Sequence, residues 1–377
     1  MATKNNLPAS ETDIAYMKRA LALAERGRGL VSPNPLVGCV IVKDDKVVGE
    51  GYHQQFGEAH AEINALREAG DHAMGATLYV TLEPCSHQGK TGPCTISILE
   101  AGVARVVVGM TDPNPQVNGA GLNFLRSKGI SVTDNVLQDK CLEMNEGYVK
   151  YITTGKPLIT LKIAQTLDGR IATSSGHSKW ITSEQARSMA HKLRSLNDAL
   201  LIGIGTILMD DPQLTLHSVK GVQPRRIILD SKLRVPLDAN ILNDKLPGRT
   251  IILATATASR EKISRIEEKG GQVILFEPDS RGWVPQDKIW NKLGEIGITS
   301  VVVEGGSTVF TETIKSGFAD RFCYFVAPKI LGSGIDAIGD LNIRNINSAI
   351  PLADVVVKRL DTDFVITGRF EHLKTIS

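Results

Sequence analysis

The chain has 377 residues, of which 42% are apolar and 22% are charged, and its formal net charge is +2 at pH 7. This length fits two domains, and the composition argues against disordered and membrane classes. The near-neutral charge gives no electrostatic case for nucleic-acid binding. No apolar run approaches the roughly 20 residues of a membrane helix, and the N-terminus lacks an apolar signal core, so we expect a cytoplasmic protein. The five cysteines are expected to be reduced thiols, some of them on a metal.

The first half of the sequence alternates helix and strand signals. Ser10 and Asp13 have the spacing of a capping box, and apolar residues then recur at helical spacing up to Gly27. Helices are also predicted over 60–69, 95–101, 122–128 and 141–151. Strands are predicted over 37–42, 46–52, 77–82, 103–110 and 130–136. This pattern indicates a sheet with helices on its faces.

A second alternating run follows the segment 153–157, which has the composition of a linker. We therefore expect one domain over 1–152 and another over 153–377. Strands are predicted over 157–164, 199–205, 225–230, 250–255, 272–276 and 300–306. Helices are predicted over 183–197, 283–296 and 307–316. The segment 354–370 predicts a closing β-hairpin.

One histidine, two cysteines and a glutamate form the first chemical pattern. His60 opens a predicted helix, Cys85 follows a strand, and Cys94 precedes another helix. An imidazole and two thiolates bind zinc well, and three protein ligands leave the fourth tetrahedral position for water, as catalytic zinc sites do. Glu62 lies two residues from His60. We predict that Glu62 takes the proton of this water and passes it to a leaving amine.

The spacing of this pattern is close to the deaminase signature H-x-E followed by P-C-x-x-C. Here eight residues, 86–93, separate the two cysteines and must loop out before the second ligand. We interpret His87, inside that loop, as at best a substrate-loop residue. The other thiols are expected to be small buried hydrophobes; they are Cys39, Cys141 and Cys323.

In the second half, three segments at or just after the ends of predicted strands have features of a phosphate site. The segment 203–205 begins a dinucleotide fingerprint, but Leu208 stands in place of the third glycine, so the match is weak. The segment 304–308 joins a β-branched strand to a helix whose first N–H groups favour phosphate. The segment 230–234 offers Ser231 and two cations to a 2′-phosphate, which favours NADPH over NADH. Each segment also fits an ordinary turn or a solvated loop.

These motifs together resemble the bifunctional riboflavin-biosynthesis deaminase–reductase family. The deaminase part is carried by segments 33–38, 60–62, 81–87, 94 and 112–115. The reductase part is carried by segments 161–164, 167–169, 178–182, 186–187, 191–194, 198–199, 203, 206, 210–212, 214–215 and 304–306. The long cysteine spacing belongs to this family's pattern. The resemblance implies an N-terminal cytidine-deaminase-like α/β/α domain followed by a dihydrofolate-reductase-like α/β domain.

The resemblance also implies the chemistry. The first domain would hydrolyse the 2-amino group of 2,5-diamino-6-(5-phosphoribosylamino)pyrimidin-4(3H)-one with a zinc ion bound by His60, Cys85 and Cys94. The second would use NADPH to reduce the ribosyl to a ribityl side chain. Asn34 is implied to line the base pocket. The implied NADP contacts are Ala164, Trp180, Thr206, Asp210, Ser231, Gly306, Ser307 and Thr308. The implied substrate contacts of the reductase are Ser178, Arg194, Leu214 and Glu304.

The sequence departs from the family pattern at two positions. His217 stands where the family commonly has an arginine that contributes to substrate binding. We hypothesise that His217 faces the substrate phosphate; alternatively, Arg225 or Arg226 supplies the missing charge. Gly92 stands where the family usually has the first of two prolines before the second cysteine, which keeps the ligand and is expected to loosen the loop.

Two other functions fit parts of the sequence. A nucleic-acid-editing deaminase needs a basic track that bears aromatic residues, and only 5% of this chain is aromatic. A scaffold stapled by a structural zinc needs a fourth protein ligand. We therefore expect a small phosphorylated pyrimidine as the partner, no nucleic acid, no membrane, and a homo-oligomer formed through the reductase domain.

Overall fold

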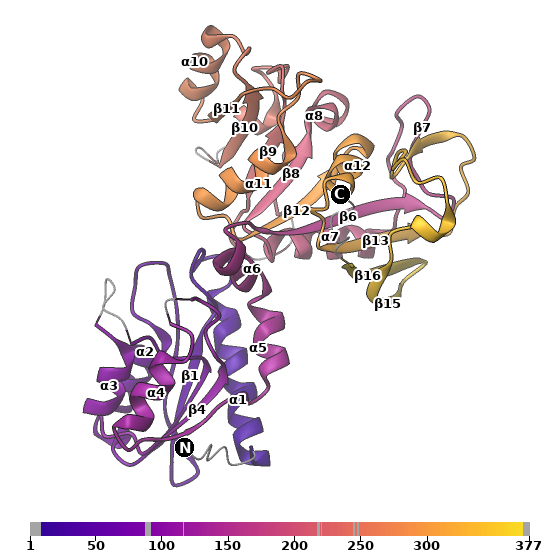
Figure 1. Ribbon diagram of the computed structural model, residues 1–377. Coiled ribbons are helices and arrows are strands. Elements are labelled where there is room, and N and C mark those ends of the chain that lie inside the picture. The colour runs from indigo at the N-terminus through magenta and orange to yellow at the C-terminus, as the bar shows by residue number, and fades with distance from the viewer. Residues whose placement is uncertain are drawn as a thin grey trace. The chain divides into compact units, whose positions relative to one another are not determined.

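The computed structural model describes residues 9–86, 92–115, 117–216, 219, 221–243, 246 and 249–371. The chain divides into two compact units, Met1–Gly155 and Lys156–Ser377. Both units are drawn in Figure 1. In the part of the chain that is described, no helix has the length and apolar character needed to cross a membrane.

The first unit is built on a five-stranded sheet with the order β2-β1-β3-β4-β5. The strands are β1 (Gly38–Lys43), β2 (Lys46–Tyr52), β3 (Thr77–Leu82), β4 (Arg105–Met110) and β5 (Ser131–Thr133). β1 pairs antiparallel with β2 and β3, whereas β3, β4 and β5 run parallel. The predicted strand over 130–136 is shorter in the structure.

Helices cover both faces of this sheet (Figure 1). Val40 and Val42 on β1 pack with α1 (Glu11–Ala24). Cys39 and Ile41 point to the opposite face, because successive side chains of a strand alternate. That face is covered by α2 (Ala61–Ala69), α3 (Cys94–Glu100) and α4 (Ala120–Ser127). The α/β/α architecture expected for the first domain is confirmed.

The predicted helix over 141–151 is wrong at one point, because the chain breaks into α5 (Gln138–Met144) and α6 (Glu146–Thr154). Asn145 separates them. Its buried side chain accepts from the backbone N–H of Leu36 at 2.8 Å and donates to the Leu36 carbonyl at 2.9 Å. Thr153 and Thr154, which we expected in the linker, belong to the last turn of α6.

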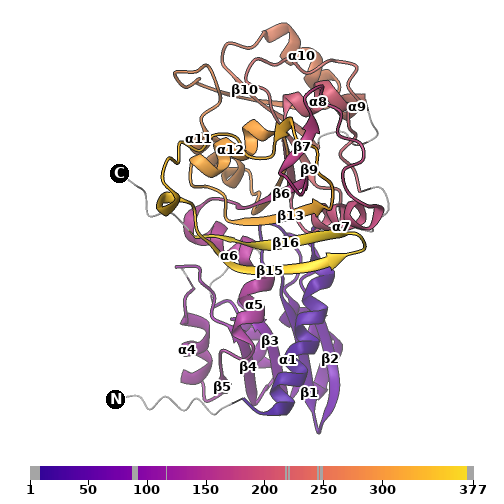
Figure 2. The same ribbon diagram turned by 90° about the vertical axis from the view of Figure 1, so that its right-hand side faces the viewer.

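The second unit is built on a nine-stranded sheet with the order β11-β10-β9-β8-β12-β6-β13-β16-β15. All neighbouring pairs from β11 to β13 are parallel, and β13, β16 and β15 pair antiparallel. The strands are β6 (Leu158–Thr166), β8 (Ala199–Gly203), β9 (Arg225–Leu229), β10 (Thr250–Thr255), β11 (Gln272–Phe276), β12 (Ser300–Gly305), β13 (Arg321–Ala327), β15 (Leu352–Leu360) and β16 (Asp363–Phe370). The predicted closing hairpin is β15–β16 at the sheet edge (Figure 2).

Helices lie on both faces of this second sheet as well. One face carries α11 (Gln286–Glu295) and α12 (Ser307–Lys315). The other carries α7 (Glu184–Ser195), α8 (Ile204–Asp210), α9 (Asn240–Asn243) and α10 (Arg260–Glu268). A smaller two-stranded sheet pairs β7 (Arg170–Thr173) with β14 (Gly334–Asp336). The predicted strand over 199–205 ends at Gly203, where α8 begins at once. β13 was not predicted.

The predicted capping box is confirmed and forms part of a buried polar cluster. The Asp13 backbone N–H donates to Ser10 Oγ, and Asp13 Oδ2 accepts from the Ser10 backbone N–H. Asp13 Oδ1 also accepts from Arg105 Nη1 at 2.8 Å and from the Tyr79 hydroxyl at 3.1 Å. Burial alone would raise the pKa of Asp13, but the hydrogen bonds from Arg105 and Ser10 outweigh it and lower the pKa to about 2.

Replacing this carboxylate tests how much it stabilises the first unit. Because the pKa of Asp13 falls from 3.8 to about 2 on folding, Asp13→Asn should lower the free energy of unfolding by about 2 kcal/mol at pH 7. The loss should shrink as the pH falls from 4 toward 2, where the wild-type carboxylate itself becomes protonated. Urea unfolding across this pH range measures it, with Asp44→Asn in an exposed turn as the control. Equal stability of Asp13→Asn and wild type at pH 7 would contradict the assignment.

Candidate active sites

His60, Cys85 and Cys94 come together at one end of the first sheet. Cys85 follows β3, His60 is the N-cap of α2, and Cys94 is the first residue of α3. One candidate ligand atom from each residue lies within 4.8 Å of the others. His60 Nδ1 is 3.2 Å from Cys94 Sγ and 3.6 Å from Cys85 Sγ. Ligand bond lengths of zinc place tetrahedral N and S ligands about 3.6 Å apart, so these side chains fit a zinc ion.

The two thiols affect each other's ionisation. Hydrogen bonds from the Cys94 thiol and from His60 lower the pKa of Cys85, although burial opposes the change. The pKa of Cys94 is raised because this pair shares a proton and Cys94 is buried. Metal binding would release that proton and leave two thiolates. His60 and Cys94 lie at the ends of helices that pack together on one face of the sheet, which brings the trio together.

Glu62 lies beside this trio, in the first turn of α2, and is 3% exposed. Burial has the largest effect on the pKa of Glu62 and, together with the smaller effect of Cys85, raises it to about 7. The nearby His60 and a hydrogen bond with Cys94 act in the opposite direction. A carboxyl with a pKa near the working pH both accepts and returns a proton readily. Among the described residues, the metal-ligand cluster contains only the trio, so Glu62 remains outside it.

Glu83 fixes the backbone that carries Cys85. Its buried carboxylate accepts hydrogen bonds from the backbone N–H groups of Asp112, Gly119 and Gly121 at 3.1, 2.9 and 2.8 Å. These groups belong to the loop after β4 and to the start of α4. A carboxylate satisfied by several backbone donors resists displacement, since each donor would be left unpaired. The sequence reasoning assigned no role to Glu83, which is two residues before a ligand.

Asn34, the implied base-pocket residue, is held by a buried histidine. His53 Nδ1 lies 3.2 Å from the Ala59 carbonyl, which can only accept, so Nδ1 carries the proton. His53 Nε2 is then the acceptor for Asn34 Nδ2 at 3.0 Å. Burial lowers the pKa of His53, which keeps the ring neutral and able to accept this bond. This bond uses one of the two N–H donors of Asn34, so the amide oxygen and the second N–H are left for a ligand.

A cavity of about 1300 Å³ opens in the second unit at the carboxyl ends of the parallel strands. Such edges are where open α/β sheets bind ligands. All the implied NADP contacts line this cavity, as do four of the implied substrate contacts. They are Ala164, Ser178, Trp180, Arg194, Thr206, Asp210, Leu214, Ser231, Glu304, Gly306, Ser307 and Thr308. The residues come from β6, β12, α7, α8 and α12, and from the connections between elements.

Glu304 and Arg194 form a buried ion pair in the wall of this cavity. Arg194 Nε and Nη2 donate to the two carboxylate oxygens of Glu304 at 2.6 and 2.8 Å. Lys162 Nζ approaches Glu304 Oε2 to 3.7 Å. Burial would raise the pKa of Glu304, but the charges of Arg194 and Lys162 lower it to about 2. This carboxylate is therefore ionised at every working pH and keeps the arginine fixed. Lys162 lines the cavity too, a placement that its sequence context did not predict.

Phosphate-binding features lie on two other walls. Gly305 ends β12, and Gly306, the N-cap of α12, has a φ of +82°, which favours glycine. The first N–H groups of α12 have no intrahelical acceptor. Ser231, Lys232 and Arg234 follow β9 and line the same cavity. Buried Asp230 shapes this turn by accepting from the Val235 backbone N–H at 2.8 Å.

Two predicted residues are not placed at these sites. His217 and His87 lie outside the described residues. Arg225 and Arg226, the alternative to His217, do not line the cavity. Arg225 Nη1 donates to the Ile296 carbonyl at 3.3 Å, and the buried Arg226 donates to the Gln213 carbonyl at 3.2 Å. Gly92 is exposed just before Pro93, the N-cap of α3.

Comparison with known proteins covers both units. A family model of the RibD C-terminal domain matches residues 157–366. A model of the cytidine and deoxycytidylate deaminase zinc-binding region matches residues 10–110. The riboflavin biosynthesis protein RibD of Aquifex aeolicus is 47% identical over 357 residues, which are 94% of this chain and 98% of that protein. RibD of Escherichia coli K12 is 44% identical over 334 residues, 85% and 89% of the two chains.

Solved structures agree over nearly the whole chain. Acinetobacter baumannii RibD, form 1, is 36% identical, covers 96% of this chain and 99% of its own, and superposes with a TM-score of 0.85. A Thermotoga maritima protein described as a diaminohydroxyphosphoribosylaminopyrimidine deaminase/5-amino-6-(5-phosphoribosylamino)uracil reductase is 37% identical. It covers 95% of this chain and 99% of its own, with a TM-score of 0.83.

Metal analysis tests the ligand assignment. Wild-type protein should contain about one zinc per chain, and Cys85→Ser should lose most of it, because a neutral hydroxyl replaces a thiolate ligand. Cys323→Ser is the matched control: it alters a buried thiol of the second unit and should leave zinc unchanged. Full zinc occupancy in Cys85→Ser protein would contradict the site.

Proposed function

Because this chain belongs to the RibD family of riboflavin biosynthesis proteins, we propose that it performs two successive reactions on one phosphorylated pyrimidine. The first unit hydrolyses the 2-amino group of 2,5-diamino-6-(5-phosphoribosylamino)pyrimidin-4(3H)-one. The second unit reduces the ribosyl side chain with NADPH, giving 5-amino-6-(5-phospho-ribitylamino)uracil. The observation that carries the proposal is the presence, in one chain, of a zinc-compatible trio beside a buried glutamate and of a separate cavity with phosphate-binding features.

In the deaminase site, His60, Cys85 and Cys94 would hold a zinc ion, which supplies Lewis acidity toward the attacking water. Glu62 accepts a proton from that water and delivers it to the amine that leaves. Its burial, and the pKa of about 7 that results, suit both transfers. Asn34 offers its amide oxygen to a donor on the ring, and His53 keeps that amide from rotating.

In the reductase site, NADPH supplies a hydride, and the protein orients the two reactants. Gly306, Ser307 and Thr308 present backbone N–H groups to the cofactor phosphates. Glu304 and Arg194 present a fixed, charged wall to the substrate. Since their charges do not change over the working pH range, they act by positioning and electrostatics rather than by proton transfer.

We also propose that the protein is cytoplasmic and forms a homo-oligomer through the second unit. All five cysteines are free thiols, which suits a reducing compartment. The strand β15 borders the sheet and has four exposed apolar side chains: Leu352, Val355, Val356 and Val357. An exposed apolar edge strand is usually covered by a partner.

A separation of the two activities tests the proposal. Glu62→Gln should lower deamination by roughly a hundredfold or more, as loss of a general acid–base typically does. NADPH oxidation with the already deaminated substrate should stay near wild type, because Glu62 belongs to the first unit. Glu143→Gln, on an exposed position of α5, is the control that should preserve both rates. If both rates collapse in folded Glu62→Gln protein, the assignment of one reaction to each unit is wrong.

A further inference from the structure

An exposed indole lies on one wall of the cavity in the second unit, and the proposed reaction assigns no role to it. Trp283 lies in the connection between β11 and α11, lines the cavity, and remains 38% exposed. A tryptophan left open on a cavity wall costs free energy that a ligand recovers by covering it. We therefore expect a flat, apolar group of a ligand to pack on this side chain.

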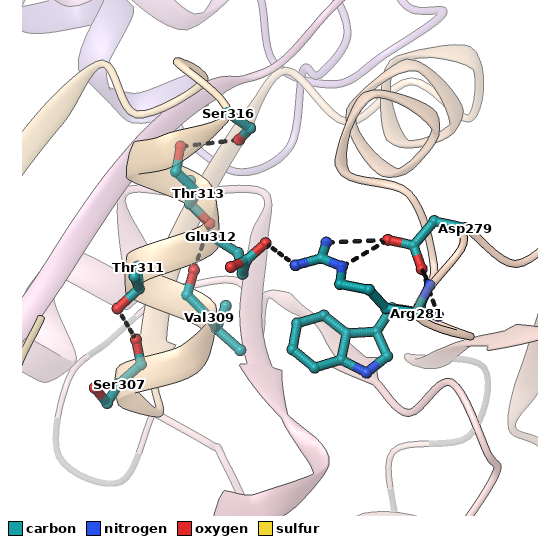
Figure 3. Close-up of polar contacts among 9 residues, drawn as sticks. Asp279, Arg281, Ser307, Val309, Thr311, Glu312, Thr313 and Ser316 are labelled. Atoms are coloured by element: carbon teal, nitrogen blue, oxygen red, sulfur yellow. Dashed lines mark hydrogen bonds and ion pairs between the residues drawn. The ribbon is translucent and has the colours of Figure 1, made fainter. Parts of the chain in front are cut away.

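A charged cluster holds the indole in place. The guanidinium carbon of Arg281 lies 4.4 Å from the centroid of the Trp283 ring. Arg281 Nη1 donates to Glu312 Oε2 at 2.8 Å, and Nε and Nη2 donate to Asp279 Oδ2 at 3.1 and 3.0 Å. Figure 3 shows Arg281 spanning from Asp279 to Glu312 on α12. Arg281 itself does not line the cavity, so it supports the ring from outside the ligand space.

The backbone around the indole is fixed by the same carboxylate. Asp279 Oδ1 accepts from the backbone N–H groups of both Arg281 and Trp283 at 2.9 Å. The Asp279 backbone N–H in turn donates to the Trp283 carbonyl at 2.8 Å. A ring whose backbone and one face are already restrained loses little conformational entropy when a ligand stacks on it.

The position of Trp283 relative to the proposed 2′-phosphate site indicates which group of the cofactor packs on it. The Val284 backbone N–H donates to Ser231 Oγ at 3.2 Å, which ties this wall to the segment carrying Ser231, Lys232 and Arg234. In NADPH the 2′-phosphate and the adenine are attached to neighbouring carbons of one ribose. A cofactor that places its 2′-phosphate at Ser231 therefore brings its adenine to the wall formed by Trp283.

We propose that Trp283 is the platform on which the adenine of NADPH stacks, and that Arg281 is its positioning residue. The inference rests on the proposed function of the second unit. Stacking on an aromatic side chain tolerates any base, so the platform contributes affinity, and the cations near Ser231 supply the preference for a 2′-phosphate. Trp180 also lines the cavity, with the guanidinium carbon of Arg187 at 4.5 Å from its ring centroid. Among the described contacts, no hydrogen bond ties its segment to Ser231 as the Val284 N–H does for Trp283, so Trp180 would contact another part of the cofactor.

Calorimetric titration of the full chain with three probes tests the platform. Trp283→Leu should weaken NADPH and adenosine 2′,5′-bisphosphate by about tenfold or more. Binding of reduced nicotinamide mononucleotide, which lacks adenine, should be unchanged. Trp283→Phe should recover most of the lost affinity because it retains an aromatic face. Unaltered binding of reduced nicotinamide mononucleotide by each variant would show that the second unit is otherwise intact.

The role of Arg281 is tested by non-additivity. Arg281→Met should weaken NADPH less than Trp283→Leu does, and the double variant should bind no worse than Trp283→Leu alone, because the arginine acts through the ring. Arg344→Met, which removes an exposed arginine paired with Asp340, is the control and should leave NADPH binding unchanged.

Two results would overturn the platform while the reductase assignment stands: wild-type affinity for NADPH in Trp283→Leu, or an equal loss for the probe that lacks adenine. A wild-type chain that does not bind NADPH would instead overturn the proposed function of the second unit, and the platform with it.

Discussion

Both proposed sites depend on one constraint: the carboxyl ends of neighbouring parallel strands meet at one edge of a sheet. In the first unit β3 and β4 run parallel, so the segments that follow them, with Cys85 and Asp112, emerge side by side. In the second unit β6, β8, β9 and β12 deliver the cavity residues to one edge. Because backbone hydrogen bonds fix the register, side chains that are distant in sequence are placed close together in space.

Buried carboxylates then play opposite roles according to their partners. The carboxylate of Glu83 accepts hydrogen bonds from several backbone N–H groups, and the charge of Glu304 is compensated by Arg194 and Lys162. Removing a partner from either would leave a buried charge unpaired, so both hold geometry. Among the residues that the structure describes, no lysine or arginine pairs with Glu62, and burial raises its pKa to about 7. The same residue type thus serves as a fixed anchor in two places and as a proton carrier in a third.

The zinc trio and most elements could be predicted because their signals are local. Ser10 and Asp13 are separated by one helical turn, and the ligands stand at the ends of predicted elements. What could not be predicted depends on distant partners. Asn145 breaks a helix because it bonds Leu36, far away in sequence. The strand β13 is buried on both faces and lacks the alternation that marks a strand. The roles of Lys162 and Trp283 can be recognised only from the cavity that they line.

The central claim is that two different reactions occur in sequence at two sites of one chain. It is tested most directly by following ammonia and NADPH together in a single reaction started with the diaminopyrimidine substrate. The account predicts that ammonia release begins first, that NADPH oxidation lags behind it and reaches an equal final amount, and that ammonia release persists when NADPH is omitted. NADPH oxidation without prior ammonia release, or deamination that requires NADPH, would contradict it.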